Sequence, residues 1–297
     1  MPVNLGDYAS KFTTQLDTII ERESLTSDLG NGGLLGEFTD AGEVKVPDIV
    51  VEGLADYSRT DGFVSGGYTF GWQTYKLRYD RGREFNIDIL DDEERAKIVS
   101  ANVMSEFTRT KVIPEMDAVR FATMHEHAGV QKAETITTPE AAVKAIDAAE
   151  NKMQDIGIDL SDVLLYCTSE FKSLLRAAQN YRMSQGENPN GRFTIYDDMK
   201  IVPVPSARFQ TKIELLDGTT SSEEAGGFKA ASDAKLINFM LVDPSAALAI
   251  QKHQTLRYFS PAVNQKRDAH LWQYRVFHDL LVLKNKKDKI YASVPAA

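Results

Sequence analysis

Few residues in this sequence have the types and spacing that metal binding or catalysis needs. The four consecutive carboxylates at 91–94 could hold a divalent cation through their oxygens. At the start of a helix, the same side chains more often stabilise the positive end of the helix dipole. His125 and His127 would lie about 200° apart around a helix, so they cannot ligate one ion together. No HExxH pair is present either, and a zinc site is not expected.

The other candidate motifs are incomplete. Cys167 follows an apolar run, which predicts a buried and inert thiol and not a nucleophile. The loop from Gly186 to Phe193 has the outline of a phosphate-binding loop, but it lacks the Lys-Ser/Thr pair and contains Glu187. We therefore expect no catalytic residues, no cofactor and no metal, and we expect that the chain is not an enzyme.

The composition is that of an ordinary globular protein of 297 residues. Hydrophobic residues make up 42% and charged residues 26%, which excludes wholesale disorder. No apolar run reaches the roughly 18 residues of a membrane-spanning helix. The N-terminus lacks the pattern of a secretory signal, and the single cysteine excludes an intrachain disulfide. These features fit synthesis in a reducing cytosol without a membrane partner.

Charge is unevenly distributed along the chain. The net charge is −9, which argues against a generic nucleic-acid binder. Residues 251–297 nevertheless hold 9 basic and 3 acidic residues, while the rest of the chain holds 25 basic and 40 acidic residues. The basic band could contact nucleic acid, or it could attract the acidic part of another copy of the chain. Charge alone does not decide between these readings.

Residues 43–89 have the alternation of β-strands, with aromatic side chains on one face. Apolar and polar residues alternate from Tyr68 to Trp72, and the alternation continues from Tyr75 in the opposite phase. The change of phase predicts a bulge at 73–74, and the residues at 80–82 predict a turn. A two-stranded ribbon is marginal alone, so we expect it to lean on its own body or on a neighbour.

Two segments flank this β region. Residues 1–29 have apolar residues at helical spacing and are ended by the glycine-rich stretch 30–33, which predicts either an arm that docks on another surface or a frayed terminus. Residues 91–127 predict a long helix, with a kink or a fresh start at Pro114.

The remainder alternates between helices and strands. We expect helices at 139–156, 171–181 and 243–250. We expect strands at 163–167, 201–205, 236–242, 272–283 and 290–294. The strand at 201–205 is predicted to lie at a sheet edge because prolines cannot donate to a ladder. Loops are expected at 184–191 and 217–234, the second one mobile, and a polar turn is expected at 284–289.

Several motifs, in this order, resemble the major capsid proteins of tailed bacteriophages. They are Tyr57 to Phe63, Gly66 to Tyr68 with Trp72, the DRG-x-x-F-x-x-D run within Leu77 to Asp88, the carboxylates at 91–94, and the PExDA run within Val112 to Arg120. The ending from Leu271 to Val294 is also similar to that family. The resemblance covers nearly the whole chain.

The resemblance implies an α+β fold of the Hong Kong 97 type. Residues 1–30 would be the N-terminal arm and 31–90 the extended E-loop. Residues 91–135 and 251–282 would form the peripheral domain, including its long spine helix. The axial domain would be 136–250, with 283–297 as a candidate segment that rejoins it.

The resemblance also implies a structural role in the virion. Copies of the chain would assemble into hexamers and pentamers in the host bacterial cytoplasm and form an icosahedral head. The head would enclose double-stranded DNA without sequence-specific binding. The acidic residues of the chain would let the DNA slide if they line the lumen, but the sequence does not show which face carries them. A portal is an expected partner. Some relatives begin with a long scaffolding segment, whereas this sequence begins almost directly at the arm, so a separate scaffolding protein is also expected.

Five charged residues are candidates for ion pairs between subunits, with a solvated β surface as the alternative for them. They are Arg59, Arg78, Asp80, Arg81 and Glu84. Some relatives join subunits by a Lys–Asn isopeptide bond that a nearby Glu catalyses. Here Lys45, Lys76 and Asn264 are present, but the strand from 271 to 282 offers only Asp279 as an acid. We expect no such crosslink.

Three other functions remain open. A cellular nanocompartment shell would have the same fold. A soluble metal-dependent hydrolase would use the carboxylates at 91–94 and the histidines. A nucleic-acid-binding module would use residues 251–297.

Overall fold

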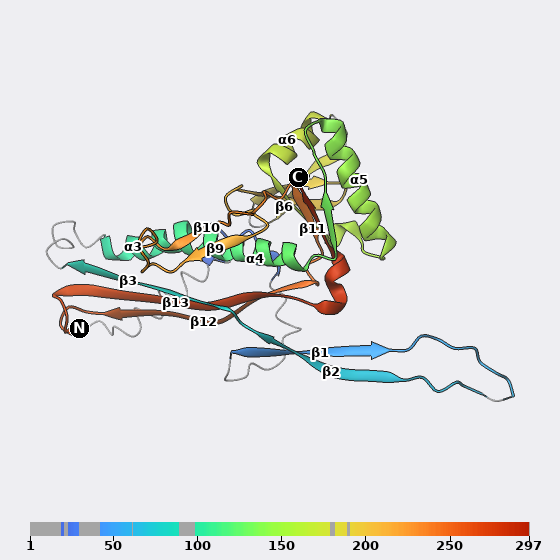
Figure 1. Cartoon of the computed structure of the whole chain (residues 1–297), viewed down its shortest axis with the longest axis horizontal. Helices are drawn as coiled ribbons and strands as arrows, with labels where there is room; N and C mark the ends of the chain where they lie inside the picture. The colour runs from blue at the N-terminus through green and yellow to red at the C-terminus, as the bar shows by residue number, and fades with distance from the viewer. Residues whose placement is uncertain are drawn as a thin grey trace.

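The computed structural model places two sheets on either side of a long helix, and a two-stranded ribbon projects from one end (Figure 1). The residues that the structure describes are 19–20, 23–29, 42–60, 62–88, 99–178, 182–188 and 191–296. The carboxylates at 91–94 and most of the expected N-terminal arm therefore lie outside the described residues. No described helix is long and apolar enough to cross a membrane.

The first sheet is long, antiparallel and three-stranded. Its strands, in spatial order, are β12 (Ala247–Phe259), β13 (Ala269–Val282) and β3 (Tyr79–Asp88). Alternate residues of β13, among them Trp272, Tyr274 and Val276, are buried against the long helix. Met104 and Met116 of that helix complete this core. The period-two burial is what a sheet with one covered face requires.

The long helix runs from Val99 to His127 in three parts. They are α3 (Val99–Phe107), a π-helical turn η3 (Thr108–Val112) and α4 (Ile113–His127). Pro114 lies in the first turn of α4, where its missing N–H costs nothing. The predicted fresh start at Pro114 is confirmed, because the π-helical turn η3 ends at Val112 and α4 begins at the next residue. At about 1.5 Å per residue the helix is roughly 40 Å long.

The second sheet has seven strands. Their spatial order is β4 (Val130–Ala133), β14 (Ile290–Val294), β11 (Phe239–Val242), β5 (Leu164–Thr168), β8 (Met199–Val204), β7 (Gly191–Tyr196) and β6 (Met183–Asn188). Helices α5 (Pro139–Asp155) and α6 (Ser169–Ala177) pack on one face, and Phe121 and Met124 of α4 pack on the other. Because both faces are covered, β5 and β11 are apolar and buried at every position or nearly so.

Residues 23–29 fasten the start of the described chain to the long helix. The buried carboxylate of Asp117 accepts hydrogen bonds from the hydroxyls of Ser24 (2.8 Å) and Thr26 (2.7 Å). Arg120, also buried, donates to Thr26 at 2.7 Å. Burying both charges together, with several hydrogen bonds, avoids the cost of an isolated buried ion. This segment therefore has a fixed position on α4.

Four sequence predictions are wrong in this part of the fold. Residues 247–250 begin β12 and are not helical, because a short apolar run fits either structure and pairing with β13 decides. Residues 184–188 form β6 of a hairpin and not a loop. The predicted edge strand at 201–205 is β8, which lies inside the sheet between β5 and β7. Because β7 pairs with it only from Met199 to Ile201, Pro203 does not have to donate a hydrogen bond to β7. Within 217–234, β10 (Gly227–Ala230) pairs with β9 (Ile213–Leu216) in a second hairpin.

The predicted turn at 80–82 is also wrong. These residues lie inside β3, and the chain changes sheets at Leu77 and Arg78 instead. Gly82 is required by the strand pairing, because a Cβ at this position would lie 2.8 Å from the carbonyl oxygen of Tyr274 on β13. The glycine allows two backbones to approach closely, which sequence alone does not separate from a turn glycine.

Candidate assembly surfaces

The ribbon consists of β1 (Glu43–Val51) and β2 (Tyr68–Lys76), joined by the ribbon tip, residues 52–67. The two strands pair without interruption from Glu43–Lys76 to Val51–Tyr68, so the predicted bulge at 73–74 is wrong. The change of phase in the sequence has another cause. The ribbon carries apolar side chains on both of its faces, each in a different stretch.

The inner face anchors the ribbon to the body at its root. Val44, Val46 and Leu77 are buried, and Tyr75 packs beside them. Their neighbours are apolar residues where β12 and β13 meet: Leu248, Ile250, Leu281 and Leu283. The sequence expectation that the ribbon leans on its own body is therefore confirmed for its root.

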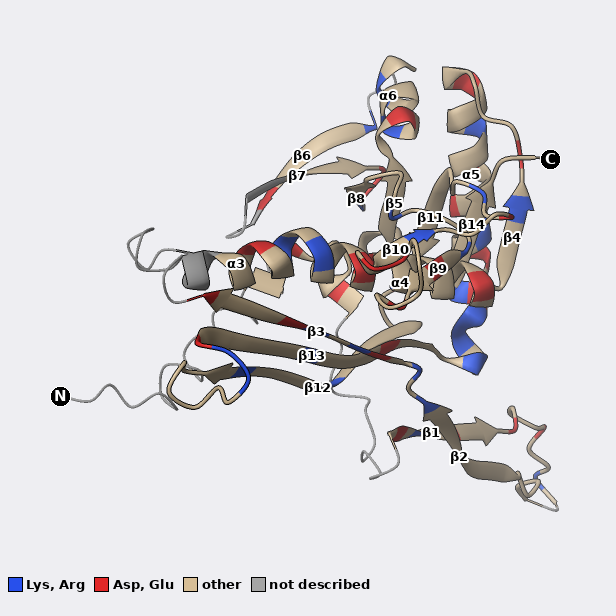
Figure 2. Ribbon diagram, turned by 60° about the vertical axis from the view of Figure 1, so that its left-hand side comes forward, with Lys and Arg blue, Asp and Glu red and all other residues tan. Residues whose placement is uncertain are grey.

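The outer face of the ribbon is apolar, and no other described part of the chain covers it. It comprises three cross-strand pairs, Pro47–Trp72, Ile49–Phe70 and Val51–Tyr68. The exposed fractions are 59% for Ile49, 69% for Val51, 79% for Tyr68, 52% for Phe70 and 56% for Trp72. Figure 2 shows few charged residues along the two strands. A contiguous apolar surface of this kind usually marks a contact with another molecule.

The ribbon tip has a defined shape. The backbones of Ser58 and Gly62 exchange hydrogen bonds of 3.1 and 2.9 Å. The rings of Tyr57 and Phe63 pack at a centroid distance of 4.8 Å. At the base of the tip, Gly67 donates its backbone N–H to the carboxylate of Glu52 at 2.7 Å. Phe63 is nonetheless 89% exposed, so the tip presents an aromatic group that no described residue covers.

The five charged residues that the sequence singled out are not brought together at one site. Arg59 lies exposed in the ribbon tip. The other four have partners in their own chain: Arg78 with Asp279 (3.1 Å), Asp80 with Arg275 (2.8 Å), Arg81 with Glu115 (2.7 Å) and Glu84 with Gln273 (2.8 Å). Two of the residues considered for a crosslink have partners in their own chain: Asn264 donates to the carbonyl of Ala269, and the carboxylate of Asp279 accepts from Arg78.

Arg78 is held at the root of the ribbon by a buried carboxylate. Asp279 is 1% exposed and accepts from the backbone N–H and the guanidinium of Arg78. Partial burial opposes the charge of Arg78, but the hydrogen bond and charge of Asp279 outweigh it and raise the pKa of the guanidinium. This pair fixes the point at which the chain leaves β2 and enters β3.

Arg81 links three elements. Its guanidinium forms a two-pronged ion pair with Glu115 of α4, at 2.7 and 3.2 Å. It also donates to the carbonyl oxygens of Leu216 and Gly227 in the β9–β10 hairpin, at 2.9 and 3.3 Å. Arg81 comes from the DRG motif and Glu115 from the PExDA motif. Two charged motifs far apart in sequence could have suggested a pair, but the hairpin had no sequence signal.

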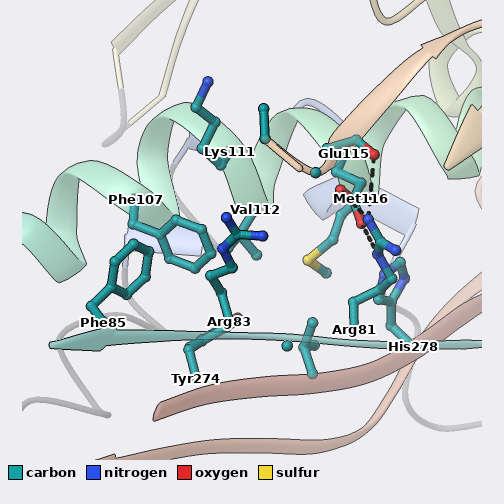
Figure 3. A pocket seen from close by; sticks show the side chains of 15 residues that line it. Arg81, Arg83, Phe85, Phe107, Lys111, Val112, Glu115, Met116, Tyr274 and His278 are labelled. Carbon is teal, nitrogen blue, oxygen red and sulfur yellow. Dashed lines mark hydrogen bonds and ion pairs between the residues drawn. The ribbon is translucent and has the colours of Figure 1, made fainter. Parts of the chain in front are cut away.

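These elements, together with β13 and the α3–η3 part of the long helix, line a hollow of about 210 Å³, which we call the helix pocket (Figure 3). Its apolar walls are Phe85, Phe107, Val112, Met116 and Val276, and Ala225, Gly226 and Gly227 of the hairpin line it as well. Phe107 packs edge-on against Phe85 and Tyr274, with centroid distances of 4.9 and 5.8 Å. Arg81, Arg83, Lys111 and Glu115 supply its charged groups. Sequence reasoning missed this pocket.

His278 also lines the helix pocket and is 1% exposed. Burial, together with the positive charges of Arg120 and Arg81, lowers its pKa to about 3. The imidazole is therefore neutral at physiological pH. It stacks on Tyr79 at a centroid distance of 5.9 Å, and its Nδ1 has no hydrogen-bond partner among the described residues.

The described part of the chain contains no group of three or more His, Cys, Asp or Glu side chains that could hold a metal ion. Burial raises the pKa of the Cys167 thiol to about 12, so it is a poor nucleophile. The basic C-terminal band is partly engaged within the chain. Arg275 pairs with Asp80, and Lys289, on the lysine-rich turn η5 (Lys284–Lys289), pairs with Asp243 at 2.6 Å.

Comparison with known proteins gives structural matches. No family model matches the chain, and no curated protein is similar enough in sequence to count as a relative. The capsid structure of the cyanophage P-SCSP1u has a TM-score of 0.61 at 10% identity, covering 87% of this chain and 85% of that chain. A structure from Mycobacterium phage Ogopogo has a TM-score of 0.57 at 14% identity, covering 92% of both chains. The virus-like particle from Pyrococcus furiosus has a TM-score of 0.55 at 12% identity, covering 97% of this chain and 99% of that chain.

These matches define the class of protein by its architecture. The chain has the α+β fold of tailed-phage capsid proteins, the Hong Kong 97 type that the motifs predicted. At such low identity the likeness concerns the fold, and roles of single residues do not follow from it.

Proposed function

We propose that this chain is the major capsid protein of a tailed bacteriophage. Copies of it assemble into hexamers and pentamers in the host cytoplasm and close into an icosahedral head around double-stranded DNA. A separate scaffolding protein and a portal take part. The observation that carries the proposal is the ribbon, on a chain with the capsid fold. The ribbon is anchored at its root, and its outer apolar face and aromatic tip stay exposed among the residues that the structure describes.

The fold divides naturally under this proposal. The three-stranded sheet and the long helix form the peripheral domain, and the seven-stranded sheet forms the axial domain. The pairing of β14 with β11 supports assigning the C-terminal strand to the axial domain. The pairing of β4 with β14 supports moving residues 130–133 there as well. Of the five charged candidates, Arg59 is the one that we retain for a contact between subunits.

Electron microscopy and light scattering of the purified chain test the proposal. The chain is expressed alone and together with a candidate scaffolding protein. We expect closed shells, or hexamers and pentamers that close when the scaffold is added. A monomer or dimer that persists under both conditions would contradict the proposal.

A nanocompartment shell is the second candidate. Its support is the match to the virus-like particle from Pyrococcus furiosus, which extends over nearly all of both chains. The contents of particles isolated from the native source separate the two. Nuclease-protected double-stranded DNA of uniform length supports the phage head, whereas a single enclosed protein supports the nanocompartment.

A further inference from the structure

The ribbon tip and the helix pocket are complementary in shape and in polarity. The pocket volume of about 210 Å³ exceeds that of an apolar cavity of about 150 Å³ that holds benzene. It therefore has room for one aromatic ring. Its walls present aromatic edges and faces from Phe85, Phe107 and Tyr274, against which a further ring packs well.

The ribbon tip offers such a ring in a fixed position. Phe63 is held against Tyr57, and the Ser58–Gly62 backbone pair closes the loop behind them. Leu54 and Val64 are also exposed, by 107% and 65%. A group that is ordered before binding loses less conformational entropy when it binds. The tip is thus a preformed apolar knob.

Charges at the two sites have opposite sign. By sequence the ribbon tip holds three acidic residues, Glu52, Asp56 and Asp61, and one basic residue, Arg59, so its net charge is negative. Arg83 and Lys111 stand at the helix pocket in addition to Arg81, whose charge Glu115 balances. Opposed charges around an apolar contact favour the correct partner and its orientation.

The ribbon tip cannot reach the helix pocket of its own chain. In Figures 1 and 2 the ribbon leaves the body at the end of the long sheet and extends away from the long helix. Each chain has one tip and one pocket, and different surfaces that meet in this way build rings or extended assemblies. The occupant must therefore come from a second copy.

We propose that the aromatic knob at Phe63 of one copy inserts into the helix pocket of a neighbouring copy. This inference rests on the proposed function, because it names the receiving surface for the ribbon within the shell. Phe63 packs between Phe107 and the Ala225–Gly227 stretch, and the acidic residues of the tip face Arg83 and Lys111. The β9–β10 hairpin is then part of an interface between subunits.

Photo-crosslinking tests this contact directly. The variant Phe63→benzoylphenylalanine keeps an aromatic group at the tip and reacts with what it touches. Assembled particles are irradiated, and mass spectrometry identifies the joined peptides. We expect a crosslinked dimer whose second peptide contains residues of the helix pocket, foremost Phe107, Met116 or 225–227. Val263→benzoylphenylalanine, at an exposed position on the β12–β13 turn, is the matched control and should not label the pocket.

The outcomes separate this contact from the proposed function. Shells that crosslink from position 63 to other residues, to the scaffold or to nothing overturn the contact and leave the capsid role intact. An unmodified chain that never forms shells overturns both.

A second pair of variants tests the same contact without a photoreactive group. Ala225→Trp fills the pocket from its exposed rim, and Phe63→Ala removes the knob. If both act on one contact, each lowers particle yield at least tenfold and the double variant is no worse than either. Independent losses that multiply in the double variant would contradict the proposal.

Discussion

Arg81, Glu115 and Asp117 come from two short motifs of the sequence, and in the fold each holds other parts of the same chain. Arg81 and Glu115 join β3 to α4, and Asp117 holds the segment at 23–29. The sequence analysis placed these residues in motifs that resemble a known family, but it could not show their partners. Ser24 lies 93 positions from Asp117, and no local pattern reports such a contact.

His278 should make the stability of the subunit depend on pH. Its pKa of about 3 in the folded chain lies below the usual value of about 6.5, so the unfolded chain binds the proton more readily. The contribution of the neutral His278 side chain to folding stability is therefore fully present above about pH 6.5 and is lost as the pH falls toward 3. Below pH 6.5, we expect wild type to lose up to about 1.4 kcal/mol per pH unit relative to His278→Phe. Parallel urea-unfolding profiles of the two proteins between pH 8 and 4 would refute this.

Glu150 should have the opposite effect at higher pH. Burial first, then the neighbouring carboxylate of Asp197, raises its pKa to about 8. The folded chain keeps a proton that the unfolded chain releases above about pH 4.5, so stability falls as the pH rises from 4.5 toward 8. Glu150→Gln is neutral at every pH and can donate to Asp197. We expect it to be more stable than wild type by about 1 to 3 kcal/mol at pH 8, and equal to it near pH 4. An advantage that does not change with pH would contradict the explanation.

Elements with strong periodicity could be predicted from the sequence. The long helix, the strands β5, β11, β13 and β14, and helix α5 lie where alternation or helical spacing placed them. The failures share a cause, which is that pairing with distant segments overrode local signals. Gly82, Pro203 and the glycines at 226 and 227 suggested turns, edges and loops, yet each lies in or beside a paired strand. The helix pocket went unseen because it needs the β9–β10 hairpin, which has no periodicity of its own.

The role of Arg81 as a link between elements predicts the effect of reversing its charge. Arg81→Glu would place two carboxylates together, since Glu115 is only 13% exposed, and would remove the donors to Leu216 and Gly227. We expect a loss of about 2 to 4 kcal/mol in the free energy of unfolding, measured in urea on unassembled subunits. Arg275→Glu is the matched control, because its pair with Asp80 is 62% and 42% exposed and should contribute less than about 1 kcal/mol. Equal losses of unfolding free energy in both variants would show that the contacts of Arg81 with the hairpin do not stabilise the subunit.

At the scale of the whole molecule, one part of the ribbon stabilises the fold and another part is available for assembly. Its root is buried in the body, so the fold needs it, while the described residues of one chain leave its outer face exposed. The sequence suggested a ribbon with aromatic residues on one face. It could not tell the anchored stretch from the exposed one, because apolar residues in both phases look alike until the strands are paired.

Replacing the outer aromatic pair should therefore abolish shells without unfolding the subunit. Phe70 and Trp72 pack against each other at a centroid distance of 5.5 Å and are 52% and 56% exposed. For the double variant Phe70→Ser with Trp72→Ser, we expect a free energy of unfolding within about 1 kcal/mol of wild type. We also expect at least a tenfold lower yield of particles by light scattering and microscopy, because each subunit loses apolar area at its contacts. Val263→Ser, 59% exposed on the body, should change neither. Normal particles from the double variant would mean that the outer face binds another partner. A lowered free energy of unfolding would mean that these rings stabilise the subunit itself.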